Sequence, residues 1–373
     1  MKVLMLSYEF PPLGGGGAKV VYGLTKEMGG LGHEVDVVTM GFRNLPRHEK
    51  LNDANIYRVP CLRSRESICS TPEMVSYALS AVPFVLRLVK SKHYDINHTH
   101  FIFPDGLVSY LLKKMTKLPY IITAHGSDVP DYNPDRFRIE HKILSPIWKK
   151  IVADADHLVC LSETLKSLVH KHYSGNNVSV IPNAIDLDRF EPFKKKYKRI
   201  LIVTRMFERK GIQHFLKAVN GLELDHDINI VGDGPYLPTL KKMVDGQGEK
   251  IKFWGWLDHS SNELRRLYES SSIFVLPSES ENFPIVLLEA MSAAMAIITT
   301  KNTGCEEVVG DSALLVEPRN PVSIREALER LIRQPDLCSD LGKSARKRLL
   351  DNFTWNVVTS RYVDQYDRYA SHK

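Results

Sequence analysis

Apolar residues gather along the chain in short continuous runs, which alternate with longer stretches of helical spacing. In the first half the runs cover 2–8, 34–40, 96–101, 119–126 and 157–162. Continuous apolar runs of this length are typical of parallel strands that are buried on both faces. Between the first two runs, Val20, Leu24 and Met28 fall on one helical face. Strand, glycine loop, helix and strand in this order predict a βαβ unit.

The second half repeats this alternation. Its apolar runs cover 200–205, 228–234, 251–256, 272–278, 296–300 and 313–318. The repeat predicts an α/β protein with two Rossmann-like, doubly wound domains, at 1–182 and 183–354. Ligands of such sheets bind outside the carboxyl ends of the strands, so we expect the domains to face each other across a deep cleft. The basic stretch EPFKKKYKR at 191–199 is interpreted as a solvated linker.

Composition supports a globular protein of two domains. The chain has 373 residues, of which 43% are hydrophobic and 25% charged. The net charge of +6 is too mild to indicate nucleic-acid binding, but it suits phosphorylated small molecules or an anionic membrane surface. The five cysteines are odd in number and form no CxxC, so neither a disulfide framework nor a zinc site is indicated. We therefore expect a cytoplasmic protein.

Membrane association is left open by the sequence. The N-terminus lacks the features of a signal peptide, and no apolar run approaches 18 residues, so we expect no spanning segment. The apolar stretch 77–94 ends with Arg87, Lys90 and Lys92. An interfacial patch on anionic lipid has this pattern, and so does a core helix with a solvated basic end. A peripheral contact with the inner face of the cell membrane is therefore one of two interpretations.

A glycine loop separates the first strand from the first helix. Gly14 to Gly17 allow the backbone to approach a ligand, and the amides of the following helix can hold an anion. The loop matches neither GxGxxG nor GxxxxGK[ST], so it supports neither a dinucleotide site nor a P-loop. A mobile loop without a ligand is the alternative.

Polar residues follow two other predicted strands. Arg205 ends a strand and Lys210 lies five residues on, an arrangement that suits a diphosphate, although solvated surface charges would look the same. The motif HGSD places His125 and Asp128 just past a buried strand. A histidine between a strand end and a glycine is a better candidate for a site than an isolated one.

The stretch SESENFPIVLLEAM at 278–291 places Glu281 and Glu289 eight positions apart. Pro284 suits a first helical position, so we expect Glu281 in a strand–helix loop and Glu289 about one turn into the helix. The first helix amides, at Ile285 and Val286, would hold a phosphate. The carboxylates would accept hydrogen bonds from sugar and ribose hydroxyls, each worth roughly 1.5–3 kcal/mol. The spacing therefore favours a site for a nucleotide diphosphate sugar.

The ordered set of motifs resembles the retaining glycosyltransferases of family 4, which have the GT-B fold. The resemblance covers nearly the whole chain through PPLGGGGA, GHEVDVVT, HGSD, ADADHLVCLS, VIPNAID, RMFERKG, VGDGP, FWGW, the two glutamates and TGCEEVVGDSALLVEP. It implies a hexosyltransferase that transfers a sugar from a UDP- or GDP-linked donor to a lipid-linked, polysaccharide or small-molecule acceptor. It also implies that a C-terminal helix at 355–373 packs back on the first domain.

The resemblance assigns roles to individual residues. The expected catalytic residues are His125 against the transferred sugar, Glu281 on its hydroxyls, and Arg205 and Lys210 on the diphosphate. The expected donor-binding residues are Gly16, Gly17, Trp256, Asn282, Phe283, Pro284, Ile285, Val286 and Glu289, the last of these on the ribose. Many relatives carry Gly-Phe-Gly where this chain has Asn282-Phe283-Pro284. Proline has no N–H, so one donor to the sugar is absent.

The resemblance implies no cofactor and no metal. Three D-x-D triplets begin at Asp154, Asp186 and Asp225, but their positions do not suggest a metal site. The histidines of HTH at 98–100 are interpreted as structural, or at most as part of an acceptor cleft. An enzyme similar to a nucleotide-sugar epimerase, and a non-catalytic subunit that binds nucleotide or carbohydrate, are the alternatives. A phosphorylase is less compatible, because it would need a pyridoxal-binding lysine in a longer chain.

Overall fold

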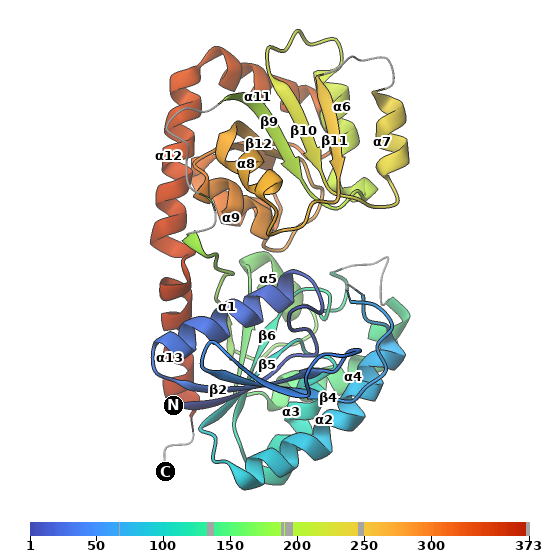
Figure 1. The fold of residues 1–373 in the computed structure, drawn as a ribbon, viewed down its shortest axis with the longest axis vertical. Helices are drawn as coiled ribbons and strands as arrows, with labels where there is room; N and C mark the ends of the chain where they lie inside the picture. Colours follow the sequence, from blue (N-terminus) through green and yellow to red (C-terminus); the bar gives the residue numbers. More distant parts are fainter. Residues whose placement is uncertain (67, 133–137, 188–189, 191–196, 245–249, 371–373) are drawn as a thin grey trace. The chain divides into compact units, whose positions relative to one another are not determined.

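The structure is a computed structural model that describes residues 1–373 apart from 67, 133–137, 188–189, 191–196, 245–249 and 371–373. The chain divides into two compact units (Figure 1). Unit 1 comprises Met1–Ala184 together with Trp355–Lys373, and unit 2 comprises Ile185–Thr354. The domain limits expected from the sequence were 1–182 with 355–373, and 183–354.

Unit 1 is built on an eight-stranded sheet with helices on both faces. Its strands are β1 (Lys2–Leu6), β2 (Glu34–Met40), β3 (His48–Leu51), β4 (Ala54–Val59), β5 (Ile96–His100), β6 (Tyr120–Ala124), β7 (His157–Cys160) and β8 (Val178–Val180). The order is β3-β4-β2-β1-β5-β6-β7-β8, and all neighbours are parallel except β3 and β4. Its helices are α1 (Gly16–Gly30), α2 (Thr71–Ser91), α3 (Asp105–Thr116), α4 (Arg138–Asp154), α5 (Glu163–His170) and α13 (Trp355–Tyr369).

Unit 2 contains a six-stranded sheet in which every pair is parallel. The strands are β9 (Tyr197–Val203), β10 (Asp227–Val231), β11 (Ile251–Gly255), β12 (Ser271–Leu276), β13 (Ala296–Thr300) and β14 (Leu314–Val316), in the order β11-β10-β9-β12-β13-β14. The helices are α6 (Ile212–Val219), α7 (Leu237–Met243), α8 (Asn262–Ser270), α9 (Ile285–Ser292), α10 (Gly304–Val309), α11 (Pro321–Arg333) and α12 (Pro335–Asn352). Short 3₁₀ turns cover Glu208–Lys210 and Gly310–Ser312.

Continuous apolar runs identify the central strands correctly. The six strands of unit 2 all fall on predicted runs, as do five strands of unit 1. The sequence analysis did not assign β3, β4 and β8, which lie toward the edges of the sheet. The strand β3 reads His-Glu-Lys-Leu, and β8 has three residues, so neither carries an apolar run. An edge strand needs fewer apolar side chains because it has a single neighbour.

The linker interpretation of 191–199 was wrong in part. Residues 191–196 lie outside the described residues, but Lys198 and Arg199 belong to β9, and the whole stretch falls within the limits of unit 2. Arg199 donates a hydrogen bond to Ser270 and lies 3.7 Å from a carboxylate oxygen of Asp227. Charged residues at the start of a strand can remain solvated while the strand continues into the core.

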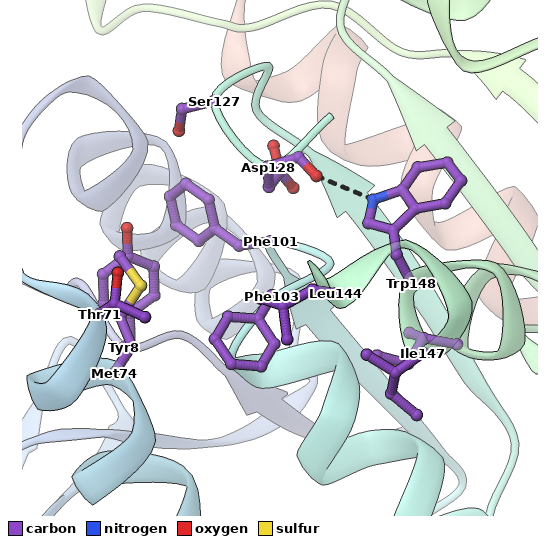
Figure 2. Close-up of a pocket in the computed structure, with 11 residues that line it drawn as sticks. Tyr8, Thr71, Met74, Phe101, Phe103, Ser127, Asp128, Leu144, Ile147 and Trp148 are labelled. Carbon is purple, nitrogen blue, oxygen red and sulfur yellow. Dashed lines mark hydrogen bonds between the residues drawn. The ribbon is translucent and has the colours of Figure 1, made fainter. Parts of the chain in front are cut away.

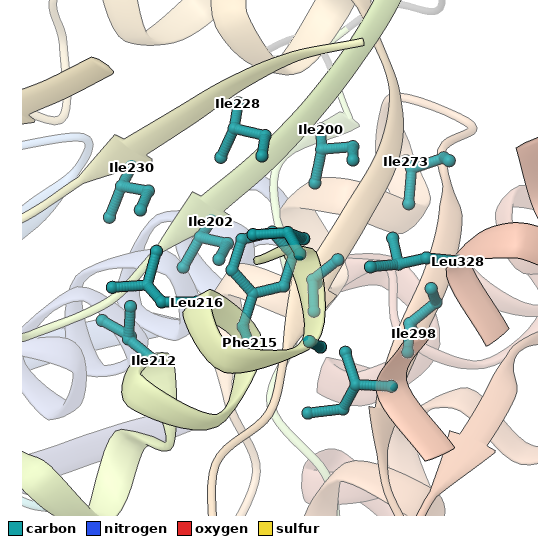
Figure 3. Packing of buried hydrophobic residues seen from close by; sticks show 14 of the residues in the cluster. Ile200, Ile202, Ile212, Phe215, Leu216, Ile228, Ile230, Ile273, Ile298 and Leu328 are labelled. Carbon is teal, nitrogen blue, oxygen red and sulfur yellow. The ribbon is translucent and has the colours of Figure 1, made fainter. Parts of the chain in front are cut away.

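The core of unit 2 packs α6 and α11 against the sheet. Isoleucines from four strands, among them Ile200, Ile230 and Ile298, surround the ring of Phe215 from α6 (Figure 3). Each of these side chains is completely buried. Burial of a side chain of this size contributes about 1.5–3 kcal/mol, so this cluster stabilises the sheet whose strand ends carry the candidate site.

Helix α2 is amphipathic and lies on the sheet of unit 1. It begins after Ser70 with a capping box formed by Ser70 and Glu73, and it buries Tyr77, Ala81 and Val85. The opposite face exposes Leu79. By length and composition alone this helix is apolar enough to cross a membrane, a property that we did not expect from the sequence. The contacts of α2 with α3, β2 and β4 show that one face of it is part of the core.

The C-terminal helix α13 belongs to unit 1 and packs against α1 (Figure 1). A methyl group built on Gly23 of α1 would lie 2.0 Å from the indole of Trp355, which begins α13. Tyr362 and Tyr366 follow on α13, four residues apart, and both rings are buried. Gly23 therefore provides the space that allows the two helices to approach at Trp355.

We predict that Gly23→Ala destabilises unit 1 by about 1–3 kcal/mol, because an added methyl group overpacks the contact with Trp355. Gly30→Ala is the matched control on the same helix, since nothing lies within 4 Å of its Cβ position. Thermal unfolding should give a midpoint that is lower by several degrees for Gly23→Ala. The control should be neutral or slightly stabilised. Equal midpoints for the two variants would contradict the close approach of α1 and α13.

Candidate functional site

Both sheets reverse direction next to their first strand. The strand β1 lies between β2 and β5, and β9 lies between β10 and β12. The connections that follow the two neighbouring strands at such a point, β1 and β5 in unit 1 and β9 and β12 in unit 2, run toward opposite edges of the sheet. This leaves a crevice at the carboxyl ends of the two strands, where ligands of open α/β sheets bind. The expected site residues Arg205 and Glu281 follow β9 and β12, and the glycine loop follows β1. All three segments therefore lie at a reversal point.

In unit 2, the loop after β9 carries the expected cations. Arg205 is exposed, and Lys210 ends the 3₁₀ turn that precedes α6. Gly211 follows in the left-handed region with a φ of 73°, and a methyl group there would lie 1.9 Å from the carbonyl oxygen of Pro277. Only glycine accommodates this conformation and this close approach. The loop is therefore held against the end of β12.

Lys210 and Glu281 form an ion pair that joins the two loops. The Nζ atom of Lys210 lies 2.5 Å from Oε1 of Glu281, and the two side chains are 12% and 14% exposed. Charges this well buried interact more strongly than surface pairs do, because water screens them less. The sequence assigned these groups to opposite parts of a ligand, the diphosphate and the sugar. The structure shows that each holds the other in place.

The helix α9 begins at Ile285, one residue later than expected. Pro284 is the residue before the helix, with φ −74° and ψ 116°, and not the first helical residue. The first amides of a helix have no partner within it, so those of Ile285 and Val286 are available to a ligand. Asn282 and Phe283 are buried before the helix. Gly304 approaches the backbone of Glu281 and Asn282 so closely that a methyl group built on it would lie 1.6 Å from the oxygen of Asn282.

Glu289 lies one turn into α9, as expected, but it is 2% exposed. Its carboxylate accepts a hydrogen bond from the hydroxyl of Tyr268 at 2.6 Å and contacts Nε2 of His259 at 2.5 Å. Tyr268 is completely buried in α8, and His259 lies in the loop that precedes α8. Sequence analysis missed both residues, since neither has a fixed spacing from Glu289. Trp256 begins the same loop and is 70% exposed.

In unit 1, the glycine loop lies directly against His125. The helix α1 begins at Gly16, and the amide of Gly15 donates to the carboxylate of Glu9 at 3.3 Å. A methyl group on Gly17 would lie 2.7 Å from Cζ of Phe101 and 3.5 Å from Nδ1 of His125. Glycine at this position therefore allows the start of α1 to contact the histidine, and the two candidate motifs of unit 1 form one site.

His125 is held by its backbone and by its ring. The carboxylate of Asp128 accepts hydrogen bonds from the amides of His125 and Gly126, at 3.0 and 2.9 Å, and from the amide of Ile102 at 2.8 Å. The ring of Phe101 packs at 4.3 Å from the imidazole. Burial lowers the pKa of His125 to about 3, so the imidazole is neutral near pH 7.

The HTH motif lies behind this site. His98 and His100 of β5 are completely buried, and Nδ1 of His100 lies 3.1 Å from Nε2 of His125. The interpretation of HTH as structural, or at most as part of an acceptor cleft, did not include this direct contact with the candidate catalytic histidine. The signal was present, because parallel neighbouring strands that end with HTH and TAH bring their carboxyl ends together. The two motifs could be related to each other only once β5 and β6 were known to be neighbouring strands.

A largely apolar pocket opens beside Asp128 (Figure 2). Phe101, Phe103 and Trp148 contribute aromatic walls, and the indole N–H of Trp148 donates to the carbonyl oxygen of Asp128 at 2.9 Å. The other lining residues are Tyr8, Thr71, Met74, Ser127, Leu144, Ile147 and Ile151. Phe101 lines the pocket and also contacts His125, so the pocket adjoins the histidine site.

Within the parts of the chain that the structure describes, no group of three or more His, Cys, Asp or Glu side chains is arranged to hold a metal ion. Asp154 and Asp156 instead bind Lys114 and Lys113. Asp225 pairs with Lys198 and His226. Asp188, in the second D-x-D triplet, lies outside the described residues.

Known proteins match the chain over nearly its full length. The family described as Glycosyltransferase Family 4 matches residues 14–189, and the family described as Glycosyl transferases group 1 matches residues 184–348. N-acetyl-alpha-D-glucosaminyl L-malate synthase of Bacillus anthracis is 26% identical over 377 residues, covering 96% of this chain and 94% of the relative.

Solved structures share the fold. Sucrose-phosphate synthase of Thermosynechococcus elongatus has a TM-score of 0.82 at 20% identity, covering 99% of this chain and 98% of that one. HepE of Anabaena, solved with UDP and glucose, has a TM-score of 0.74 at 15% identity, covering 98% and 99%. The fold and the matched families thus define a glycosyltransferase with the GT-B fold. The chain belongs to glycosyltransferase family 4.

We predict that the buried histidines destabilise the protein in acid. Burial lowers the pKa of both His98 and His125 to about 3, whereas an unfolded histidine titrates near 6.5. The unfolded chain therefore binds more protons between these values. The stability that the neutral rings contribute is complete above about pH 6.5 and is lost as the pH falls toward 3.

Urea unfolding of wild type, His98→Gln and the control His170→Gln at several pH values between 7 and 4 tests this prediction. His98→Gln should lower the free energy of unfolding at every pH. Between pH 7 and 4, however, this free energy should fall less in His98→Gln than in wild type, since one buried titrating group is gone. Replacement of the exposed His170 should leave the slope unchanged. Parallel curves for all three proteins would contradict the assignment.

Proposed function

We propose that this glycosyltransferase transfers a hexose-type sugar, with retention, from a UDP- or GDP-linked donor to a hydroxyl acceptor. The observation that carries the proposal is the ion pair of Lys210 with Glu281 at the reversal point of unit 2. Arg205 and the first amides of α9 lie in the loops at the same strand ends. A site for a nucleotide diphosphate sugar needs cationic groups for the diphosphate next to a carboxylate for the sugar hydroxyls.

The donor roles follow from the chemistry of each group. Arg205, Lys210 and the amides of Ile285 and Val286 bind the diphosphate, because all are donors or positive charges. Glu281 accepts hydrogen bonds from hydroxyls of the donor sugar, helped by the backbone of 282–284. Glu289 does the same for the ribose, and Tyr268 holds its carboxylate in one orientation. Trp256 and its loop contact the base.

Transfer requires charge to separate onto the departing diphosphate. Preorganised cations and helix amides stabilise such charge most effectively where water is excluded. We propose that Arg205, Lys210 and α9 supply this stabilisation without a metal ion. We further propose that the acceptor attacks from the face that the diphosphate leaves and that the diphosphate takes the proton of the acceptor, so that the configuration is retained.

Unit 1 contributes His125 and the glycine loop. A neutral imidazole can donate a hydrogen bond to a sugar hydroxyl, but it is a poor source of protons at a pKa of about 3. We therefore propose that His125 orients the transferred sugar and does not act as a general acid. Gly16 and Gly17 let the start of α1 approach the donor phosphates.

The apolar pocket favours an acceptor with an apolar part, such as a lipid-linked one. Phe103, Ile147 and Trp148 offer walls that suit an alkyl chain or an aromatic ring better than a free sugar. The face of α2 that carries exposed Val75, Leu79 and Lys90 would suit a peripheral contact with the cytoplasmic membrane surface.

Two alternative functions predict different behaviour. An epimerase-like enzyme would not use an acceptor, and a non-catalytic subunit would bind nucleotide without turnover.

We predict that Lys210→Ala weakens binding of UDP or GDP by about tenfold or more, because loss of a charge-assisted contact of about 1.5 kcal/mol corresponds to that factor. Glu281→Ala should keep most nucleotide affinity but lose sugar transfer by more than tenfold. Lys217→Ala, at an exposed position on α6, is the matched control. Calorimetry with each nucleotide, in EDTA, measures the first effect. Normal affinity in Lys210→Ala would place the diphosphate elsewhere.

We predict that the pocket makes transfer depend on the apolar part of the acceptor. In a series of alkyl glycosides, kcat/KM should rise with chain length, and Phe103→Ser should flatten this dependence. Donor hydrolysis, which needs no acceptor, should be unchanged in Phe103→Ser. Ile143→Ser, at an exposed position outside the pocket lining, serves as control. An equal chain-length dependence in wild type and Phe103→Ser would exclude the pocket as acceptor site.

A further inference from the structure

Three histidines and two tyrosines form a layer on one face of the sheet in unit 1, in which hydrogen bonds join His98 to Tyr366 and Thr123, Thr123 to Tyr362, and His100 to His125. His98 and His100 alternate along β5, and Thr123 and His125 alternate at the end of β6. In a strand, residues two apart point to the same face. Tyr362 and Tyr366 of α13 cover the inner end of this layer, at His98 and Thr123.

Each hydrogen bond at the inner end has one consistent direction. The hydroxyl of Tyr366 lies 2.6 Å from Nδ1 of His98, and Nε2 of His98 lies 2.9 Å from the hydroxyl of Thr123. Thr123 in turn lies 3.1 Å from the hydroxyl of Tyr362. The hydroxyl of Tyr366 also lies 3.7 Å from Sδ of Met28, but sulfur is a weak acceptor, so we infer that this hydroxyl donates to Nδ1 of His98. The proton of His98 is then on Nε2, which donates to Thr123.

His100 has the opposite arrangement. Its Nε2 atom is buried and has no hydrogen-bond partner among the residues that the structure describes. Its Nδ1 atom faces Nε2 of His125 at 3.1 Å. If Nε2 of His100 carried the proton, a buried N–H would be left without an acceptor, which is rarer and more costly than an unused lone pair. The proton of His100 therefore belongs on Nδ1.

We propose that His100 is a positioning residue that fixes the tautomer of His125. The Nδ1–H of His100 donates to Nε2 of His125, so His125 carries its own proton on Nδ1. That nitrogen is the one that faces Gly17, at 3.5 Å from the Cβ position of the glycine. The nitrogen of His125 on the side of α1 is thereby a hydrogen-bond donor and not an acceptor. The catalytic consequence rests on the proposed function, but the tautomer itself does not.

Neutral rings are a condition for this arrangement, because a protonated imidazole has two donors and no acceptor. Burial lowers the pKa of His98 to about 3 and that of His100 well below its ordinary value. The His98 and His100 rings are 4.3 Å apart, and those of His100 and His125 are 5.4 Å apart. A charge on any one of the three would therefore repel a charge on its neighbours.

Nitrogen-15 NMR of the full chain with labelled histidine at pH 7 tests the proposal, since it shows which ring nitrogen carries the proton. The signals of His125 and His98 are assigned by their loss in His125→Asn and His98→Gln. We expect Nδ1–H for His125 and Nε2–H for His98, so the second histidine is an internal reference. In His100→Phe, which has no donor, His125 should lose its preference for Nδ1–H.

His100→Asn keeps a side-chain N–H close to the position of Nδ1 and should restore the Nδ1–H form of His125. It also serves if His100→Phe fails to fold. A His125 that is protonated on Nε2 in wild type, or that stays fully Nδ1–H in a folded His100→Phe, would overturn the proposal.

Kinetics separate this inference from the proposed function. Loss of an outer hydrogen-bond partner of a ligating histidine costs roughly 10- to 100-fold at metal sites, and we expect a fall of similar size in kcat for His100→Phe. The KM for the donor should change little, and His100→Asn should recover most of kcat. If His125→Ala transfers sugar normally, the proposed role of His125 fails whatever the tautomer. If His125→Ala is inactive but His100→Phe has normal kcat, only the positioning role fails.

Discussion

The handedness of parallel crossovers determines where the candidate site residues of this protein lie. A strand–helix–strand connection is right-handed, so helices that follow two neighbouring strands toward opposite edges of the sheet cover opposite faces. In unit 1 this divergence lies between β1 and β5, and in unit 2 between β9 and β12. The glycine loop, the HTH end of β5, Arg205 and Glu281 all follow strands that meet at these points. Residues distant in sequence are thereby gathered at two strand edges.

At each edge, buried polar contacts hold the functional groups in one orientation. Glu289 is oriented by a hydrogen bond from a buried tyrosine hydroxyl. His125 is oriented by the carboxylate of Asp128, which accepts hydrogen bonds from three backbone amides, including that of His125. Lys210 and Glu281 orient each other. A group that is already oriented loses little freedom when its ligand binds, and this is the condition under which electrostatic stabilisation is most effective.

The C-terminal helix adds a constraint that is not local in sequence. Trp355 fills the space that Gly23 leaves on α1, and the tyrosines of the same helix reach His98 and Thr123. Residues of α13 thus complete the layer that lies behind His125. A loss of packing at α13 would affect the candidate site as well as the stability of unit 1, since the same side chains serve both.

Pattern in the sequence was sufficient for the central strands and for the motifs, because both depend on neighbours along the chain. Apolar runs identified β1, β2, β5, β6 and β7 and the whole second sheet, and Pro284 located the start of α9 to within one residue. Polar and short edge strands such as β3 and β8 escaped, since an edge strand needs no continuous apolar run.

By itself, the sequence determined the fold class, the family and most of the residues at the strand ends. Only the tertiary structure decided which of these residues touch. The pairing of Lys210 with Glu281, the contacts of Glu289 with His259 and Tyr268, and the contact of His100 with His125 depend on which strands are neighbours and which loops approach. Such contacts join residues 21 to 71 positions apart. No periodicity encodes these separations, because they are set by the packing of the sheet.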